Sequence, residues 1–142
     1  MNIRRAAASD TEQIAVLCGQ LGYPATAAEV SARFAKIAGL ADHAVFVAEE
    51  DAQLLGWIHV HIAPSMLATA RAELSALVVH SERRGTGVGK LLMSAAEQWA
   101  REHGCRTVRL RSNLSRAGAH AFYQRLGYHE AKTQKSFTKE LS

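Results

Sequence analysis

Hydrophobic residues recur at helical spacing in the first third of the sequence. Ser9 and Glu12 have the spacing of a capping box, and the apolar stripe that follows them ends at Gly22. Thr26 and Glu29 repeat this spacing ahead of a second stripe. The pattern therefore predicts two short helices in tandem, joined by a break at "YPA".

The rest of the chain mixes alternating, continuously apolar and helical stretches. Strands are predicted at residues 2–6, 43–50, 54–62, 72–80 and 106–113, with one or two more in 128–141. Helices are predicted at 88–104 and 116–127. The order of elements indicates an α/β protein of α+β type, with a mixed sheet of six to seven strands flanked by about four helices. No linker or repeat divides residues 1–142, so a single domain is expected.

Composition and charge indicate which kinds of ligand and which cell compartment are expected. The chain has 142 residues, of which 48% are hydrophobic, and a formal net charge of +4. This charge slightly favours an anionic ligand, and the interspersed acidic residues argue against nucleic acid. Cys18 and Cys105 match no metal spacing and indicate free thiols in a reducing compartment. Without an apolar leader or a long apolar run, a cytoplasmic protein with no membrane partner is expected.

Glycines alternate in "ERRGTGVGKLL", between a predicted strand and the best predicted helix. Bare backbone at a helix N-terminus suits an oxyanion, most plausibly a phosphate. Lys90 is followed by Leu91, which excludes the P-loop pattern, and the spacing differs from the dinucleotide fingerprint G-x-G-x-x-G. The pattern R-x-x-G-x-G, formed by Arg84, Gly87 and Gly89, suits a pyrophosphate. A glycine-rich turn that only starts a helix is the alternative.

Two motifs resemble one known family. "LVVHSERRGTGVGKLL" is similar to motif A of the GNAT superfamily of acetyl-CoA-dependent N-acetyltransferases, and "NLSRAGAHAFYQRLGY" to its motif B. The resemblance covers nearly the whole chain and implies a GNAT-type fold that binds acetyl-CoA as acetyl donor. It implies cofactor contacts from the pyrophosphate loop, from a strand that pairs with the pantetheine arm, and from one motif-B amide. These residues are Arg84, Gly85, Thr86, Gly87, Val88, Gly89 and Lys90; Leu77, Val78 and Val79; and Asn113.

The same resemblance suggests two catalytic residues. An alkyl ammonium has a pKa of about 10.4, so acyl transfer needs a base for the amine, and the leaving thiolate benefits from an acid. Tyr123 matches the motif-B tyrosine that protonates the coenzyme A sulfur. Glu73 opens the strand before the glycine loop, where relatives recruit a general base that acts directly or through water. A packing tyrosine and an exposed strand acid are the alternatives.

The acceptor side carries weaker signals. His59 and His61 share one strand face and could line the acceptor pocket, and Arg111 could meet an acidic part of the substrate. No cysteine or second H-x-H supports a metal, so none is expected. The resemblance is to small bacterial members that acetylate aminoglycosides or aminoalkylphosphonates, which favours a small-molecule primary amine attacked directly in a ternary complex.

Other functions stay open. One is acetylation of a protein lysine or N-terminus, which needs an open groove. Another is a non-catalytic sensor that holds acyl-CoA. A nucleic-acid binder would lack the usual aromatic interleaving. The resemblance also allows a homodimer through the last strands.

Overall fold

The computed structural model describes residues 1–111 and 117–142. It divides into two compact units, Met1–Arg111 and a second unit that begins at residue 112 and ends at Ser142. The expected asparagine contact, Asn113, lies outside the described residues. In both described ranges, every helix is too short or too polar to span a bilayer.

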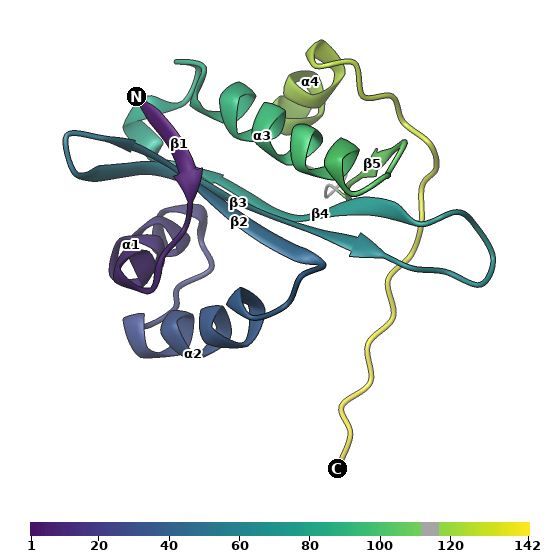
Figure 1. Ribbon diagram of the computed structural model, residues 1–142, viewed down its shortest axis with the longest axis horizontal. Coiled ribbons are helices and arrows are strands. Elements are labelled where there is room, and N and C mark those ends of the chain that lie inside the picture. Colours follow the sequence, from purple (N-terminus) through teal and green to yellow (C-terminus); the bar gives the residue numbers. More distant parts are fainter. Residues whose placement is uncertain (112–116) are drawn as a thin grey trace. The chain divides into compact units, whose positions relative to one another are not determined.

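The first unit is a five-stranded sheet with helices on both faces (Figure 1). Its strands are β1 (Asn2–Arg5), β2 (His43–Glu50), β3 (Gln53–Ala63), β4 (Arg71–Val79) and β5 (Val108–Arg109). Its helices are α1 (Thr11–Leu21), α2 (Ala27–Ala38) and α3 (Val88–Glu102), with 3-10 turns at Ala8–Asp10 and Ser81–Arg83. Neighbouring strands are antiparallel except β4 and β5, which are parallel. The mixed α/β fold expected from the sequence is confirmed.

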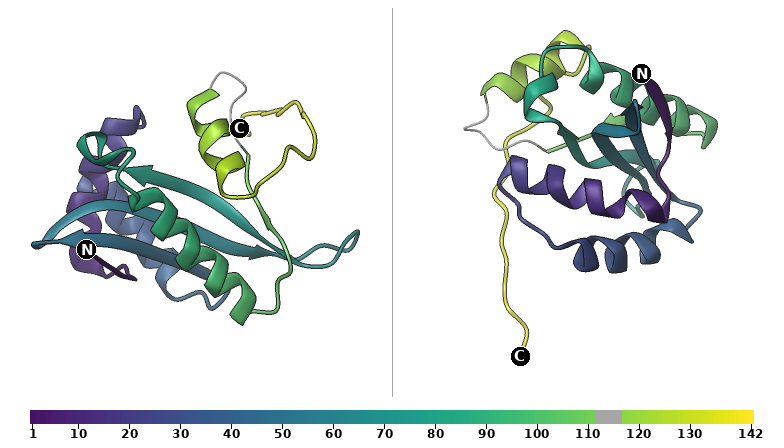
Figure 2. Two further views of the ribbon diagram at one scale, coloured as in Figure 1. Left: turned by 90° about the horizontal axis from the view of Figure 1, so that it is seen from above. Right: turned by 90° about the vertical axis from the view of Figure 1, so that its left-hand side faces the viewer.

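Helices α1 and α2 cover one face of the sheet and α3 covers the other (Figure 2, right). Apolar side chains of α3 are buried on its face, including Leu92 and Met93 at 0% and 1% exposure. On the opposite face, Ile14 and Leu17 of α1 belong to a buried cluster that also includes Val78 of β4. The sheet is therefore held from both sides, which fixes the position of β4.

Three expectations about element bounds are corrected. Among the described residues of the strand expected at 106–113, which are 106–111, only the two residues of β5 form a strand. Within the described residues of 117–142, the chain after α4 (Ala117–Arg125) has no strand, so the described sheet has five strands rather than six to seven. Ser9 lies in the first 3-10 turn instead of capping α1, whereas Thr26 and Glu29 do form the expected capping box. The bounds of β5 were not predictable, because two paired residues are too few to show an alternation of polar and apolar residues.

A buried carboxylate ties β1 to the start of α1. Asp10 accepts two hydrogen bonds from the guanidinium of Arg4, at 2.8 and 2.9 Å, and one from the backbone N–H of Ala7 at 2.7 Å. The bonds from Arg4 are the main reason that the pKa of Asp10 lies below its ordinary 3.8, although burial opposes them.

Asp10→Asn should lower the free energy of unfolding by about 1–3 kcal/mol at pH 7, because it removes the charged acceptor of a partly buried ion pair with Arg4. Since the folded-state pKa is depressed, this stabilisation is present above about pH 4 and is lost as the pH falls through the folded-state value. Urea titrations from pH 7 to pH 3 should therefore show the wild type and the variant converging. Glu12→Gln, at an exposed site on α1, is the control, and a constant gap at all pH values would contradict the assignment.

Gly56 of β3 lies directly beneath α3. A Cβ atom there would stand 2.7 Å from the carbonyl oxygen of Val78 and 3.1 Å from Leu92 Cδ1. Because the nearest atom is backbone, Gly56→Ala should lower the free energy of unfolding by about 1–3 kcal/mol in urea denaturation. Gly19→Ala, in α1 with no heavy atom within 4 Å, should be neutral or stabilising instead. Equal stabilities of the two variants would contradict the close packing.

Candidate functional site

The glycine loop between β4 and α3 leaves backbone amides without side-chain partners. Gly85 and Gly87 have φ of +80° and +94°, which favours glycine, and open space surrounds the Cβ position of both. Gly87 is the N-cap of α3 and makes no side-chain capping bond. Helix geometry leaves the first amides of α3, at Val88, Gly89 and Lys90, without partners within the helix. The loop can therefore receive an oxyanion.

The residues of the predicted glycine loop differ in the backbone and side-chain groups that they can present to a ligand. Val88 and Gly89 are buried, so they can contribute only backbone. The N–H of Thr86 donates to the carbonyl of Arg83 at 3.3 Å, which occupies that amide. The side chains of Arg84 and Lys90 are exposed and can add positive charge. Arg83 itself pairs with Glu50 of β2 at 2.8 Å, which ties the start of the loop to the sheet.

The edge of β4 is open next to this loop. Leu77, Val78 and Val79 pair with β3 on one side. On the other side, among the described residues, β5 pairs with β4 only at Ala72 and Glu73. The backbone groups of β4 that point away from β3 are thus left without a strand neighbour beyond Glu73, and an extended ligand could pair with them.

A pocket of about 240 Å³ lies where β5 separates from β4. It is lined by His61, Glu73, Leu74, Ser75, Arg109, Leu110 and Arg111. The structure thus brings together three residues singled out from the sequence, Glu73, His61 and Arg111. Ser75 and Arg109 are additions.

Local sheet geometry explains why these side chains meet. Glu73 lies directly opposite His61 across the β3–β4 pair, so the two share a face. The register shifts just before this pair, between His59 and Val60, and leaves Ser75 as an extra residue on β4. The hydroxyl of Ser75 lies 2.9 Å from Nδ1 of His61. A register shift has no signature in the sequence, which is why Ser75 was missed.

Charges in the pocket are of both signs. Oε2 of Glu73 lies 3.9 Å from Nε2 of His61, and Oε1 lies 3.9 Å from Nε of Arg71. The side chain of Glu73 is 22% exposed, so it remains within reach of water. Arg109 and Arg111 add two cations to the lining. The pocket can therefore hold a small anionic molecule beside a carboxylate and an imidazole.

His59 does not line this pocket, although it shares a strand face with His61. It contacts His43 instead, with 2.9 Å between Nε2 of His59 and Nδ1 of His43. Burial, and then the charges of His43 and His61, lower the pKa of His59 to about 4. His59 is accordingly neutral at physiological pH. His43 begins the neighbouring strand, and only the register of β2 against β3 brings it to this pair.

Tyr123 lies in the second unit, on α4. Gly127 follows the helix with φ of +94°, and the N–H of Tyr128 donates to the carbonyl of Tyr123 at 3.0 Å. This arrangement is a Schellman motif, which strongly favours glycine at position 127. The rings of Tyr123 and Tyr128 meet edge to face with centroids 6.0 Å apart. The "RLGY" of the second motif therefore fixes the end of the helix that carries Tyr123.

The sequence matches the model of the acetyltransferase (GNAT) family over residues 10–128. It is 33% identical over 96 residues to the aminoalkylphosphonate N-acetyltransferase of Salmonella typhimurium, across 67% of this chain and 61% of that protein. It is 30% identical to the uncharacterized N-acetyltransferase YhfO of Bacillus subtilis, across 92% of this chain and 91% of that protein. An aminoglycoside 6'-N-acetyltransferase from Acinetobacter haemolyticus has the same fold, with a TM-score of 0.87, 20% identity and full coverage of both chains.

The chain belongs to the GNAT family of acetyltransferases. The family and the enzyme class expected from the two motifs are thereby confirmed. The match to the aminoalkylphosphonate enzyme spans about three-fifths of that protein's length.

Proposed function

We propose that this protein moves the acetyl group of acetyl-CoA to the primary amine of a small anionic molecule. The observation that carries the proposal is the pocket in which Glu73 and His61 face two arginines, beside the unpaired edge of β4. The family match across residues 10–128 supports a single acetyltransferase domain, since it spans both compact units.

The proposed binding site for acetyl-CoA consists of the glycine loop and the open edge of β4. The free amides at the start of α3, with Arg84 and Lys90, bind the pyrophosphate, and glycine at 85 and 87 keeps that approach clear. The backbone of Leu77, Val78 and Val79 receives the pantetheine arm as an added strand. When bound, acetyl-CoA supplies a thioester carbonyl that an amine can attack.

The acceptor side supplies orientation and a base. Arg109 and Arg111 bind the anionic group of the acceptor, which holds its amine end near Glu73. Glu73 accepts the proton of the ammonium, directly or through water, and His61 assists. The neutral nitrogen forms a bond to the carbonyl carbon while the carbon–sulfur bond breaks. Tyr123 donates a proton to the leaving thiolate, and the nitrogen gives up its second proton to water as the amide forms.

The choice of an anionic acceptor rests on charge. Aminoglycosides are polycations and would meet two arginines against one carboxylate in this pocket. An aminoalkylphosphonate or an amino acid carries both the amine and an anion that a guanidinium binds with two hydrogen bonds. The Salmonella relative named for aminoalkylphosphonates supports this class.

The test is acetyl-CoA-dependent release of free thiol with a panel of amines and a no-amine blank. The panel contains aminoalkylphosphonates, amino acids, aminoglycosides, polyamines, and lysine or N-terminal peptides. We expect release above the blank with the first two classes. Turnover confined to peptides would instead indicate a protein acetyltransferase. Tight binding of acetyl-CoA without turnover on any amine would indicate a sensor.

A further inference from the structure

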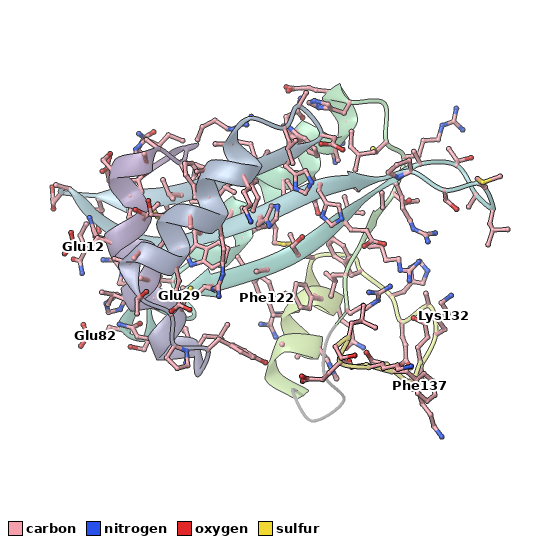
Figure 3. The ribbon with its side chains drawn as sticks, turned by 90° about the horizontal axis from the view of Figure 1, so that it is seen from below. Glu12, Glu29, Glu82, Phe122, Lys132 and Phe137 are labelled. Atoms are coloured by element: carbon pink, nitrogen blue, oxygen red, sulfur yellow. The ribbon has the colours of Figure 1, made fainter. Side chains whose placement is uncertain are left out.

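Three imidazoles gather on the sheet face that α1 and α2 cover, next to the acceptor pocket. Figure 3 views this face, with the two helices in front of the strands. His43 begins β2 and lies directly opposite His61 of β3, and His59 precedes His61 by two residues on the same face. The cluster therefore results from an H-x-H pair on one strand and a third histidine in register on its neighbour.

The rings are close enough to share one small ligand. The ring centroids of His43 and His61 lie 5.0 Å apart, and those of His43 and His59 lie 5.2 Å apart. One ring nitrogen from each residue lies within 4.8 Å of the others. Ligands at about 2.0–2.1 Å around a tetrahedral metal ion stand about 3.3 Å from one another. The difference is at most about 1.5 Å, and the planes of His43 and His61 are only 13° apart, so these side chains must turn for their nitrogens to face one ion.

At least one nitrogen in the cluster is unprotonated and carries a lone pair that could coordinate a metal ion. Nδ1 of His43 and Nε2 of His59 are 2.9 Å apart, a hydrogen bond in which one nitrogen donates and the other must accept. The accepting nitrogen carries the lone pair that a metal ion would take. A bound cation would replace the shared proton without repositioning the strands.

The surroundings of the cluster suit a cation. Oδ1 of Asp42 lies 3.9 Å from Nε2 of His43, and Oε2 of Glu73 lies 3.9 Å from Nε2 of His61. Ser75 holds the other nitrogen of His61 through its hydroxyl. Carboxylates and hydroxyls around ligating histidines orient the rings and raise their basicity. The side chains of His43 and His61 are 22% and 25% exposed, which leaves a path for an ion.

We propose that His43, His59 and His61 form a three-histidine site for a divalent transition metal ion of the Zn²⁺ type. Three imidazole ligands suit zinc, nickel or cobalt better than magnesium or calcium, which prefer oxygen. Three protein ligands leave at least one coordination position for water or another small ligand. The proposed metal site does not rest on the acetyl transfer proposed above, but it adjoins the acceptor pocket and shares His61 with it.

The test is direct titration of the purified, metal-free protein with Co²⁺, followed by its visible absorption, and then with Zn²⁺. We expect one Co²⁺ per chain with the spectrum of a nitrogen-ligated ion, displaced by one Zn²⁺. His43→Asn should weaken binding by about tenfold or more. His129→Gln, which changes an exposed histidine of the second unit, is the matched control and should bind as the wild type does.

A second measurement uses the wild type alone, so it does not depend on whether His43→Asn folds. Imidazole nitrogen NMR of the wild type should show shifts at His43, His59 and His61 on addition of one equivalent of Zn²⁺. Binding by His43→Asn equal to that of the wild type would overturn the proposal. So would nitrogen shifts at other histidines, or a thiolate charge-transfer band that Cys18→Ala removes.

Discussion

Glu73→Gln is expected to lower kcat for acetyl transfer by about 10²- to 10³-fold, while the Kd for acetyl-CoA changes by less than about twofold. General base catalysis contributes about 10²- to 10⁴-fold, and glutamine keeps the size and polarity of the side chain but cannot take a proton. The acid limb of the kcat/KM profile should change in the variant, because that limb reports the base of the free enzyme. Thiol release and calorimetric binding of acetyl-CoA measure the two quantities separately.

The matched control is Glu12→Gln. Glu12 is an exposed carboxylate on α1, labelled in Figure 3, and it does not line the pocket. It should leave kcat within about twofold of the wild type. If Glu73→Gln retains full turnover with an unchanged pH profile, Glu73 is removed from the mechanism and His61 becomes the base to test.

The second large effect is expected at Gly87. Gly87→Glu should weaken the binding of acetyl-CoA by about 100-fold or more, because it puts a carboxylate and its bulk where the loop amides would meet the pyrophosphate. The substitution also has a structural cost of about 1–2 kcal/mol, since φ at this position is +94°. Calorimetry with acetyl-CoA, together with thermal unfolding, separates the two contributions.

Gly104→Glu controls for the backbone strain. Gly104 follows the other end of α3, has φ of +78°, and has open space around its Cβ position, as Gly87 does. The two variants should therefore lose similar stability, but Gly104→Glu should bind acetyl-CoA as the wild type does. Equal losses of binding would mean that strain in α3, and not the position of the loop, explains the effect.

Most of the fold was predictable from periodicity. The capping box at Thr26 and the apolar stripe of α3 placed their helices, and two largely apolar runs separated by a turn at Asp51 placed β2 and β3. The failures have physical causes. The two paired residues of β5 leave no pattern, and the extra residue at Ser75 depends on pairing with β3. Gly56 was missed because its importance comes from α3 lying against it, a contact between distant segments.

In the candidate site, too, features set by consecutive residues were predictable and those set by distant residues were not. The position of the glycine loop before α3 was predictable because the turn and the helix start lie within a few consecutive residues, whereas its role in binding stays a prediction. The partners of His61 were not, because Glu73, Ser75 and Arg109 reach it across the β3–β4 pair or through the parallel junction with β5. His43 joins His59 and His61 only through the register of β2. The role of Tyr123 stays a prediction from the motif.

The two-residue pairing of β5 also affects which amino-acid substitutions the protein can tolerate. Arg109 and Arg111 belong to a segment that contributes few backbone hydrogen bonds to the sheet and no residue to the fully buried core. Replacing them therefore carries a small penalty in folding free energy. The glycine loop and β4 are different, because they depend on a packed strand and on glycines with left-handed backbone. Under the proposed function, preference for one amine over another can therefore be engineered at 109–111 while the glycine loop and β4 stay unchanged.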